Sequence, residues 1–103
     1  MKVVDTPEPP YYAVIAPAEL SDDIRGYPKM AEKLIELAHE QPGFIGIEAC
    51  YMEGFSLAVT YWHSLESIQQ WRENSVHLAA KNKAEEQWFS KYMTRIAKVE
   101  KAY

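Results

Sequence analysis

Two strand-like segments, residues 44–51 and 55–62, carry apolar side chains on both of their faces. Successive side chains of a strand point to opposite sides of its sheet, so odd- and even-numbered residues can be sorted by face. In residues 55–62 the odd positions are all apolar or aromatic: Phe55, Leu57, Val59 and Tyr61. The even positions are Ser56, Ala58, Thr60 and Trp62. A sheet with one face in water would alternate apolar and polar residues. The pattern therefore predicts a sheet that is covered on both sides.

The order of patterns along the chain is strand, helix, strand, strand, helix, strand. The predicted strands are residues 11–16, ended by Pro17, then 44–51 and 55–62, and a closing strand within 88–103 that alternates over 93–99. One helix starts near Pro28 and stops at Gln41-Pro42-Gly43. A second starts after the N-cap Ser64, is interrupted at Asn74 or Ser75, and resumes over residues 76–85. This predicts an α+β, ferredoxin-like βαββαβ fold with a split second helix and a four-stranded antiparallel sheet.

The chain divides into an N-terminal arm, residues 1–9, and one domain, residues 10–103. In the ferredoxin-like arrangement both helices cover the same face of the sheet, which leaves the other face bare. A bare face this rich in aromatic residues would exceed the few hundred Å² of apolar patch that monomers usually expose. With no spare helix in the chain, the expected cover is a second copy, placed face to face about a two-fold axis. We therefore expect a homodimer, assembled as a dimeric α+β barrel.

Charge and composition exclude several classes of protein. The net charge is −4 and the basic residues form no run, so we expect no nucleic-acid partner. No apolar run approaches the roughly 20 residues of a membrane helix. Acidic and proline residues between Asp5 and Pro10 argue against a signal peptide, and Cys50 has no partner for a disulfide, so a cytoplasmic location is expected. His63 and His77 lie fourteen residues apart with no ligand at metal-binding spacing, so no metal site is expected.

A set of ordered motifs resembles the antibiotic biosynthesis monooxygenase family. It consists of Gln41-Pro42-Gly43-Phe44-Ile45-Gly46, Tyr61-Trp62, Ser64-Leu65-Glu66-Ser67-Ile68 to Trp71, His77-Leu78-Ala79-Ala80, and Trp88-Phe89 to Tyr92 and Arg95-Ile96. The resemblance runs from about Tyr11 to the C-terminus. It implies a dimeric α+β barrel, in agreement with the strand parity. Members of the family include cofactor-independent monooxygenases of polycyclic phenols, quinol oxidases and haem-degrading enzymes.

The resemblance also implies where a site would lie and how it would work. The family's pocket lies between sheet and helices, beside a tryptophan that looks like Trp71; the polar aromatic residue six positions later looks like His77. A deprotonated, electron-rich substrate can itself reduce dioxygen, so such a pocket needs no cofactor. We therefore expect a cofactor-independent monooxygenase that acts on a small aromatic or quinol substrate with dioxygen.

Haem degradation is disfavoured by two departures from the haem-degrading members of the family. Those members carry an asparagine near the start of the first strand and a histidine ten positions after the tryptophan. Here the first strand reads Tyr11-Tyr12-Ala13-Val14, and the residue ten positions after Trp71 is Lys81. The asparagine that precedes the tryptophan in phenol-oxidising members is replaced by Ser67 or Gln70.

Four residues are predicted to be catalytic: His77, Trp71, Glu48 and Arg95. The imidazole of His77 titrates near neutrality and would accept a phenolic proton, while Trp71 would stack on the ring of the substrate. Glu48 lies mid-strand among apolar neighbours, so its carboxylate either pairs with Arg95 or Lys98 or orients the substrate or His77. Arg95 matches a family position near the site. Aromatic side chains expected to line the substrate site are Tyr12, Tyr51, Tyr61, Trp62 and Trp88.

Two alternatives stay open beside the enzyme. A non-catalytic domain could bind a small ligand in the same pocket, and a structural dimer module would fill that pocket with its own side chains. An empty, partly polar cavity beside Trp71 and His77 would argue against the structural module. The Lys- and Glu-rich residues 81–86 are interpreted as a solvated helix face.

Overall fold

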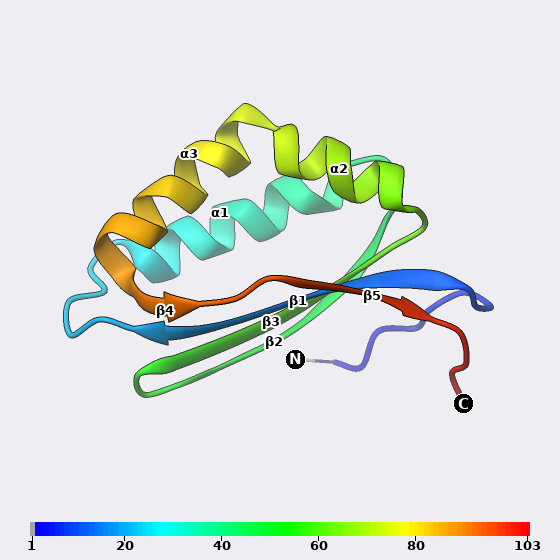
Figure 1. Ribbon diagram of the computed structural model, residues 1–103, viewed down its shortest axis with the longest axis horizontal. Helices are drawn as coiled ribbons and strands as arrows, with labels where there is room; N and C mark the ends of the chain where they lie inside the picture. The colour runs from blue at the N-terminus through cyan, green and yellow to red at the C-terminus, as the bar shows by residue number, and fades with distance from the viewer. Residues whose placement is uncertain (1) are drawn as a thin grey trace.

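The computed structural model describes residues 2–103 as one sheet with helices on one side (Figure 1). The elements in order are β1 (Tyr11–Leu20), α1 (Tyr27–His39), β2 (Phe44–Met52), β3 (Phe55–Trp62), α2 (Leu65–Glu73), α3 (Ser75–Lys83), the π-helical turn η1 (Ala84–Trp88), β4 (Phe89–Tyr92) and β5 (Arg95–Val99). The predicted α+β fold and order of elements are confirmed. The single closing strand that the sequence predicted is instead two short strands, β4 and β5.

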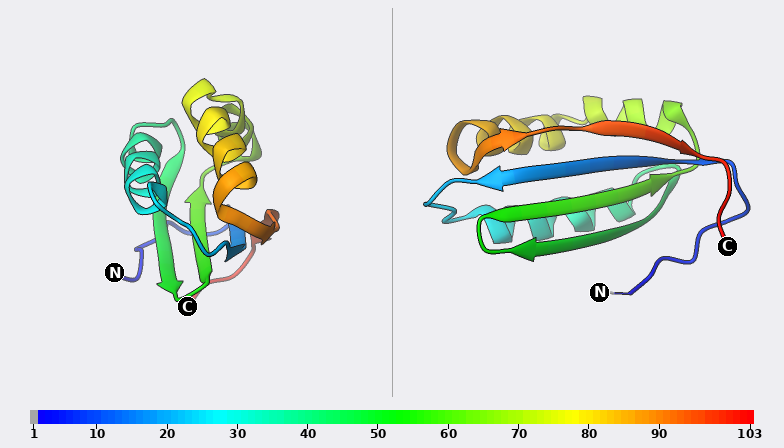
Figure 2. Two further views of the ribbon diagram at one scale, coloured as in Figure 1. Left: turned by 90° about the vertical axis from the view of Figure 1, so that its left-hand side faces the viewer. Right: turned by 60° about the horizontal axis from the view of Figure 1, so that its bottom comes forward.

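The sheet is antiparallel throughout, with the order β2-β3-β1-β4, and β5 pairs with β1 as well. β4 and β5 follow one another along the same edge of β1, with Met93 and Thr94 between them (Figure 2). The sheet of one chain is open. A barrel would therefore require the sheet of a second copy.

β1 continues to Leu20, although the sequence analysis ended it at Pro17. A proline cannot donate a backbone hydrogen bond, which normally excludes it from the interior of a sheet. Here the carbonyl oxygen of Pro17 accepts from the Met93 amide at 3.1 Å, so this side of Pro17 faces the interruption between β4 and β5. The backbone N–H that Pro17 lacks would therefore point to the gap between β4 and β5, where no regular strand pairing exists. β1 continues through Pro17 and keeps its pairing with β3.

Side-chain caps define the second helical region. The Ser64 hydroxyl accepts from the Ser67 amide at 3.0 Å and begins α2, as predicted. Asn74 adopts an extended backbone conformation between α2 and α3, and its side-chain oxygen accepts from the amides of Val76 and His77. Asn74 therefore ends one helix and caps the next, which confirms the predicted split.

The core lies between the helices and one face of the sheet. Ala38, Trp62, Ile68 and Trp71 are buried together, and the partly buried side chains packed on them are Tyr12, Val14, Leu34, Leu37 and Phe44. Trp62 is fully buried, and its indole nitrogen donates to the Thr60 hydroxyl at 2.9 Å. The even-numbered residues of β3 therefore face the helices.

The helix-free face of the sheet carries the opposite set of side chains. The register pairs Ile15 and Glu48 with Val59, and Pro17 and Cys50 with Leu57, so these residues share that face. Residues 2–10 run on the side of the sheet away from the helices (Figure 1). They cover one end of it, where the Thr6 hydroxyl donates to the Tyr11 hydroxyl and the Val4 amide donates to Glu48. Among residues 2–103, no helix is long and apolar enough to cross a membrane.

Candidate functional site

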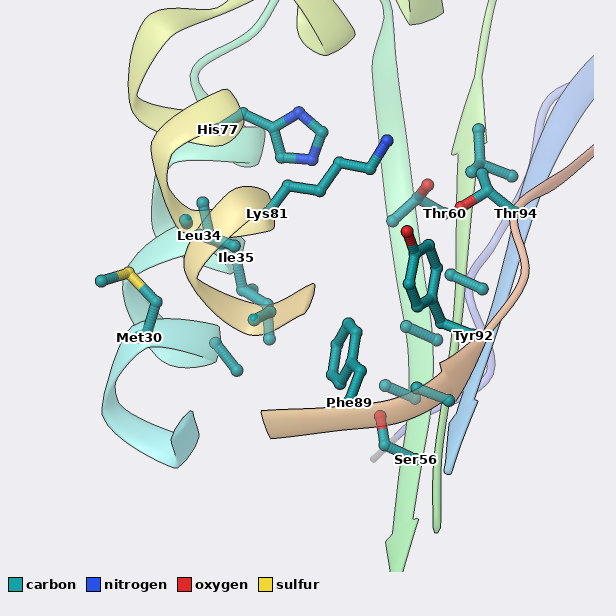
Figure 3. Close-up of a pocket in the computed structure, with 18 of the residues that line it drawn as sticks. Met30, Leu34, Ile35, Ser56, Thr60, His77, Lys81, Phe89, Tyr92 and Thr94 are labelled. Atoms are coloured by element: carbon teal, nitrogen blue, oxygen red, sulfur yellow. The ribbon is translucent and has the colours of Figure 1, made fainter. Parts of the chain in front are cut away.

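A cavity of about 840 Å³ lies between the helices and the helix-facing side of the sheet (Figure 3). We call it the central cavity; it is bounded by α1, α3, the strands and the β4 edge. Small side chains of the sheet create its space: Ala16, Ala18, Ala49, Ser56 and Ala58. Ala80 and Ala84 add room on the helical side. Because the helices rest on small residues here and on Trp62 and Phe44 elsewhere, they cannot close onto the sheet along its whole length.

His77 and Trp71 form a stacked pair on the wall of the central cavity. Their ring centroids are 4.4 Å apart and their planes differ by 20°. Trp71 packs in turn against Trp62, 6.0 Å between ring centroids. The cap at Asn74 turns the chain between the two residues and places the histidine in the first turn of α3. Trp71 and His77, which the sequence predicted as site residues, therefore lie side by side, and their catalytic roles stay a prediction.

The hydrogen bonding of His77 determines which of its ring nitrogens is free. Nδ1 lies 3.1 Å from the carbonyl oxygen of Trp71. A carbonyl oxygen only accepts, so Nδ1 carries the proton and Nε2 of the neutral ring keeps its lone pair. Burial lowers the pKa of His77, and the nearby charges of Lys81 and Arg72 lower it further, against an opposing effect of the Trp71 carbonyl. The imidazole is accordingly neutral near pH 7 and able to accept a proton.

Polar side chains line one part of the central cavity and apolar side chains the rest. Lys81 extends from α3 toward Thr60 on β3, and the hydroxyl of Tyr92 points to the same region (Figure 3). Met30, Leu34, Ile35 and Phe89 line the other part. Hydrogen bonding with the Glu85 carboxylate raises the pKa of Tyr92. The cavity is therefore amphipathic.

The interpretation of residues 81–86 as a solvated helix face is wrong for two of its members. Both Lys81 and Glu85 line the central cavity, and their side chains are only 39% and 27% exposed. α3 has no strong apolar stripe, so its hydrophobic pattern does not indicate which side faces the sheet. The spacing of four between His77 and Lys81, which puts both on one helix face, was the available signal.

Four of the predicted site residues line the central cavity: Trp71, His77, Tyr51 and Trp88. Trp88 is buried, and its indole nitrogen donates to the carbonyl oxygen of Arg25 at 3.0 Å. Tyr12 and Trp62 belong to the hydrophobic core beside the cavity. Thr60 and Thr94 also line the cavity, although the sequence motifs did not predict them as site residues.

Glu48, Tyr61 and Arg95 lie on the helix-free face, away from His77. Glu48 accepts hydrogen bonds from the Tyr61 hydroxyl and the Val4 amide, and these bonds lower its pKa. Burial, with the neighbouring Glu48, raises the pKa of Tyr61 to about 12. The predicted pairing of Glu48 with Arg95 or Lys98 is absent from residues 2–103, and the predicted orientation of His77 by Glu48 is wrong, because the sheet separates the two side chains.

No site for a metal is assembled by these side chains. Within residues 2–103, no three His, Cys, Asp or Glu side chains come together in a way that could hold a metal ion. His39 and His63 are exposed, and Cys50 lies on the helix-free face.

No family model matches the sequence. The chain is 43% identical over 97 residues to the uncharacterised protein YqjZ of Bacillus subtilis, covering 93% of this chain and 85% of YqjZ. SnoaB, a cofactor-independent oxygenase from Streptomyces nogalater, superposes with a TM-score of 0.78 over 91% of this chain and 97% of its own, at 6% identity. A candidate antibiotic biosynthesis monooxygenase from Nitrosomonas europaea gives a TM-score of 0.77 over 86% and 89%, at 11% identity. These likenesses confirm the predicted ferredoxin-like α+β fold of the single chain, while its assembly with a second copy into a barrel stays a prediction.

Proposed function

The chain belongs to the same family as YqjZ and has the fold of the antibiotic biosynthesis monooxygenases, and on this premise we propose that it is a cofactor-independent monooxygenase of a small aromatic or quinol substrate. The observation that carries the proposal is the His77–Trp71 pair on the wall of the central cavity. It presents a neutral proton acceptor that the Trp71 ring and carbonyl hold in place.

The central cavity suits a substrate of this class in size and polarity. Ligand pockets commonly have volumes of about 300–1,000 Å³ and apolar walls with a few polar groups, and this cavity of about 840 Å³ falls within that range. Phe89 offers an aromatic surface to a planar ring, while Trp71 is buried and stacks on His77. The apolar walls keep bulk water away from a reactive carbanion or phenolate.

In the proposed reaction Nε2 of His77 accepts the acidic proton of the substrate. The resulting anion is electron-rich enough to reduce dioxygen without flavin or metal. One oxygen atom enters the substrate, which is oxidised to a ketone or quinone, and the other leaves as water. The substrate supplies all the electrons for this step. The Trp71 carbonyl stabilises the imidazolium that forms, because it already accepts from Nδ1.

The cavity also bears on the rival functions. A structural module would fill the space beside Trp71 and His77 with its own side chains, and the central cavity argues against it. A ligand-binding domain would use the same cavity without turnover, so only a measurement of reaction separates it from the enzyme. Lys81 occupies the position at which haem-degrading relatives carry histidine, which continues to argue against haem.

We place the enzyme in the cytoplasm as a homodimer, because the free thiol of Cys50 suits a reducing compartment and the apolar helix-free face suits a second copy. Face-to-face packing of two such sheets would form the dimeric α+β barrel. The two central cavities would then lie on the outer sides of the sheet pair.

The test is oxygen consumption with a panel of hydroxylated naphthalenes, anthrones and quinols, with a metal chelator present. We expect uptake with at least one compound, incorporation of label from ¹⁸O₂ into the product, and loss of both in His77→Ala. His39→Ala, at an exposed helix end, is the matched control and should keep full activity. Turnover that is unchanged in His77→Ala would overturn the proposal.

A further inference from the structure

Lys81 is a cation that reaches into the largely apolar central cavity, whose lining also includes Arg72. Its side chain leaves α3 one turn after His77 and extends toward Thr60 across the cavity (Figure 3). The Lys81 side chain is 39% exposed, but its neighbours in the cavity are largely apolar, so its ammonium group gains more from an anionic partner here than on the open surface. Lys81 does not help the proposed base, His77, because the charge of Lys81 lowers the proton affinity of the His77 ring. A role for Lys81 must therefore lie elsewhere.

The chain itself provides only a weak counterion for Lys81. Glu85 is the acidic group closest to it, and its Oε1 lies 3.8 Å from Nζ. A charge-assisted hydrogen bond would be about 2.7–2.9 Å long, so this pair is a loose contact. The order is also the less favourable one, with lysine preceding glutamate on the helix. Glu85 also raises the pKa of Tyr92, so its charge acts on that hydroxyl as well as on Lys81. Of the other charged residues at the cavity, Arg72 and Glu73 lie on α2, and Glu73 accepts from Gln69.

A second donor faces the same region. The Thr60 hydroxyl oxygen already accepts from the Trp62 indole, so its own proton is free to be donated to a ligand. Lys81 and Thr60 can therefore both donate to one oxygen anion, from α3 on one side and β3 on the other. Beyond them lie the apolar side chains of Met30, Leu34 and Ile35, which would hold the hydrocarbon part of a ligand.

We propose that Lys81, with Thr60, anchors an anionic group of the substrate, so that the substrate class is an aromatic acid. The inference rests on the proposed function in taking the central cavity as the substrate site. It assigns Lys81 a role in specificity: the cation selects a carboxylated ring over a neutral ring of the same shape, while His77 acts on the phenolic or carbon acid.

The test uses two probes that differ in one charge, 6-hydroxy-2-naphthoate and its methyl ester, titrated calorimetrically at pH 7. The wild-type protein should bind the acid about tenfold more tightly, as expected for a hydrogen bond to a charged group. Lys81→Met should bind the two probes equally, and Lys81→Arg should keep most of the preference. Lys33→Met, on the exposed side of α1, removes the same charge away from the cavity and should leave the preference intact.

Equal binding of the two probes to the wild type, a preserved preference in Lys81→Met, or no binding of the acid at millimolar concentration would overturn the inference. Oxygen uptake in the same samples separates it from the proposed function. Lys81-dependent binding of the acid without oxygen uptake would leave the anchor standing and remove the oxygenase. Oxygen uptake with the ester that is unchanged in Lys81→Met would support the oxygenase and remove Lys81 as the anchor.

Discussion

The imidazole of His77 lies nearly parallel to the indole of Trp71 at 4.4 Å, while its Nδ1 is hydrogen bonded to the carbonyl oxygen of the same tryptophan. One residue thus fixes both the orientation and the tautomer of the other. The arrangement leaves Nε2 as the free acceptor, and it depends on Asn74, which caps α3 and holds the amide of His77.

This pair predicts the acid limb of the pH–rate profile. The proposed reaction requires neutral His77, and burial lowers the pKa of this residue below the ordinary value of 6.5. The rate should therefore be fully present above pH 6.5 and should fall only as the pH drops through the lower pKa of the folded protein. His77→Gln should lower kcat/KM by about a hundredfold or more, the contribution typical of a general base. A profile with its midpoint above 6.5, or one unchanged in His77→Gln, would contradict the assignment.

Glu48 should stabilise the fold in a pH-dependent way. Its pKa is lowered from 4.5 by the bonds from Tyr61 and Val4, so its contribution is present above pH 4.5 and is lost as the pH falls through the lower folded-state pKa. Glu48→Gln should reduce the free energy of unfolding by about 1 kcal/mol at pH 7 and by less at pH 3. Urea denaturation at the two pH values measures this. Glu53→Gln, in the exposed β2–β3 turn, should change neither value.

The Tyr61→Phe variant tests the hydrogen bond between Tyr61 and Glu48 by removing its donor. Because Tyr61 and Glu48 share a hydrogen bond, the double variant should be less destabilised than the sum of the two single variants. Additive losses would show that the two side chains contribute separately.

The helix-free face predicts a dimer. Leu57 lies on this face between Pro17 and Cys50, where a new carboxylate would lack the donors that Glu48 has in Tyr61 and Val4 and would be costly to bury against a second sheet. Wild-type protein should sediment with twice the mass of one chain, and Leu57→Glu should sediment as a folded monomer, with its helical circular dichroism retained. Leu65→Glu makes the same change on the exposed side of α2 and should leave the dimer intact. A wild-type monomer at micromolar concentration would refute the barrel.

Gly43 and Gly54 have the same left-handed backbone conformation but different surroundings, so alanine substitutions separate backbone strain from steric overlap. Both have φ of +80°, but a Cβ on Gly43 would overlap the side chain of Ser67, whereas a Cβ on Gly54 meets nothing within 4 Å. Gly54→Ala should cost about 1 kcal/mol of unfolding free energy, from the left-handed backbone alone. Gly43→Ala should cost more, because α2 must also move. Thermal unfolding of the two variants gives the comparison, and equal losses would mean that the Ser67 contact yields freely.

Local patterns were enough to predict most of the fold. The apolar stripe of α1, the cap at Ser64, the break at Asn74 and the β-prone run of β3 depend on neighbours within a few residues, so they can be read from the sequence directly. The motifs around Trp71 and His77 were equally local, and they identified the two residues that the structure brings together.

Tertiary structure alone decided which face of the sheet holds the site. Parity grouped Glu48 with Cys50, but parity cannot tell which group the helices cover, and here they cover the other one. The same limit applies to Lys81, since a helix with no strong apolar stripe does not reveal its inward side. The cavity itself arises from alanines on separate strands and helices that meet only in the folded chain. A sequence records the local periodicity of each element, whereas a site depends on the packing of distant elements against one another.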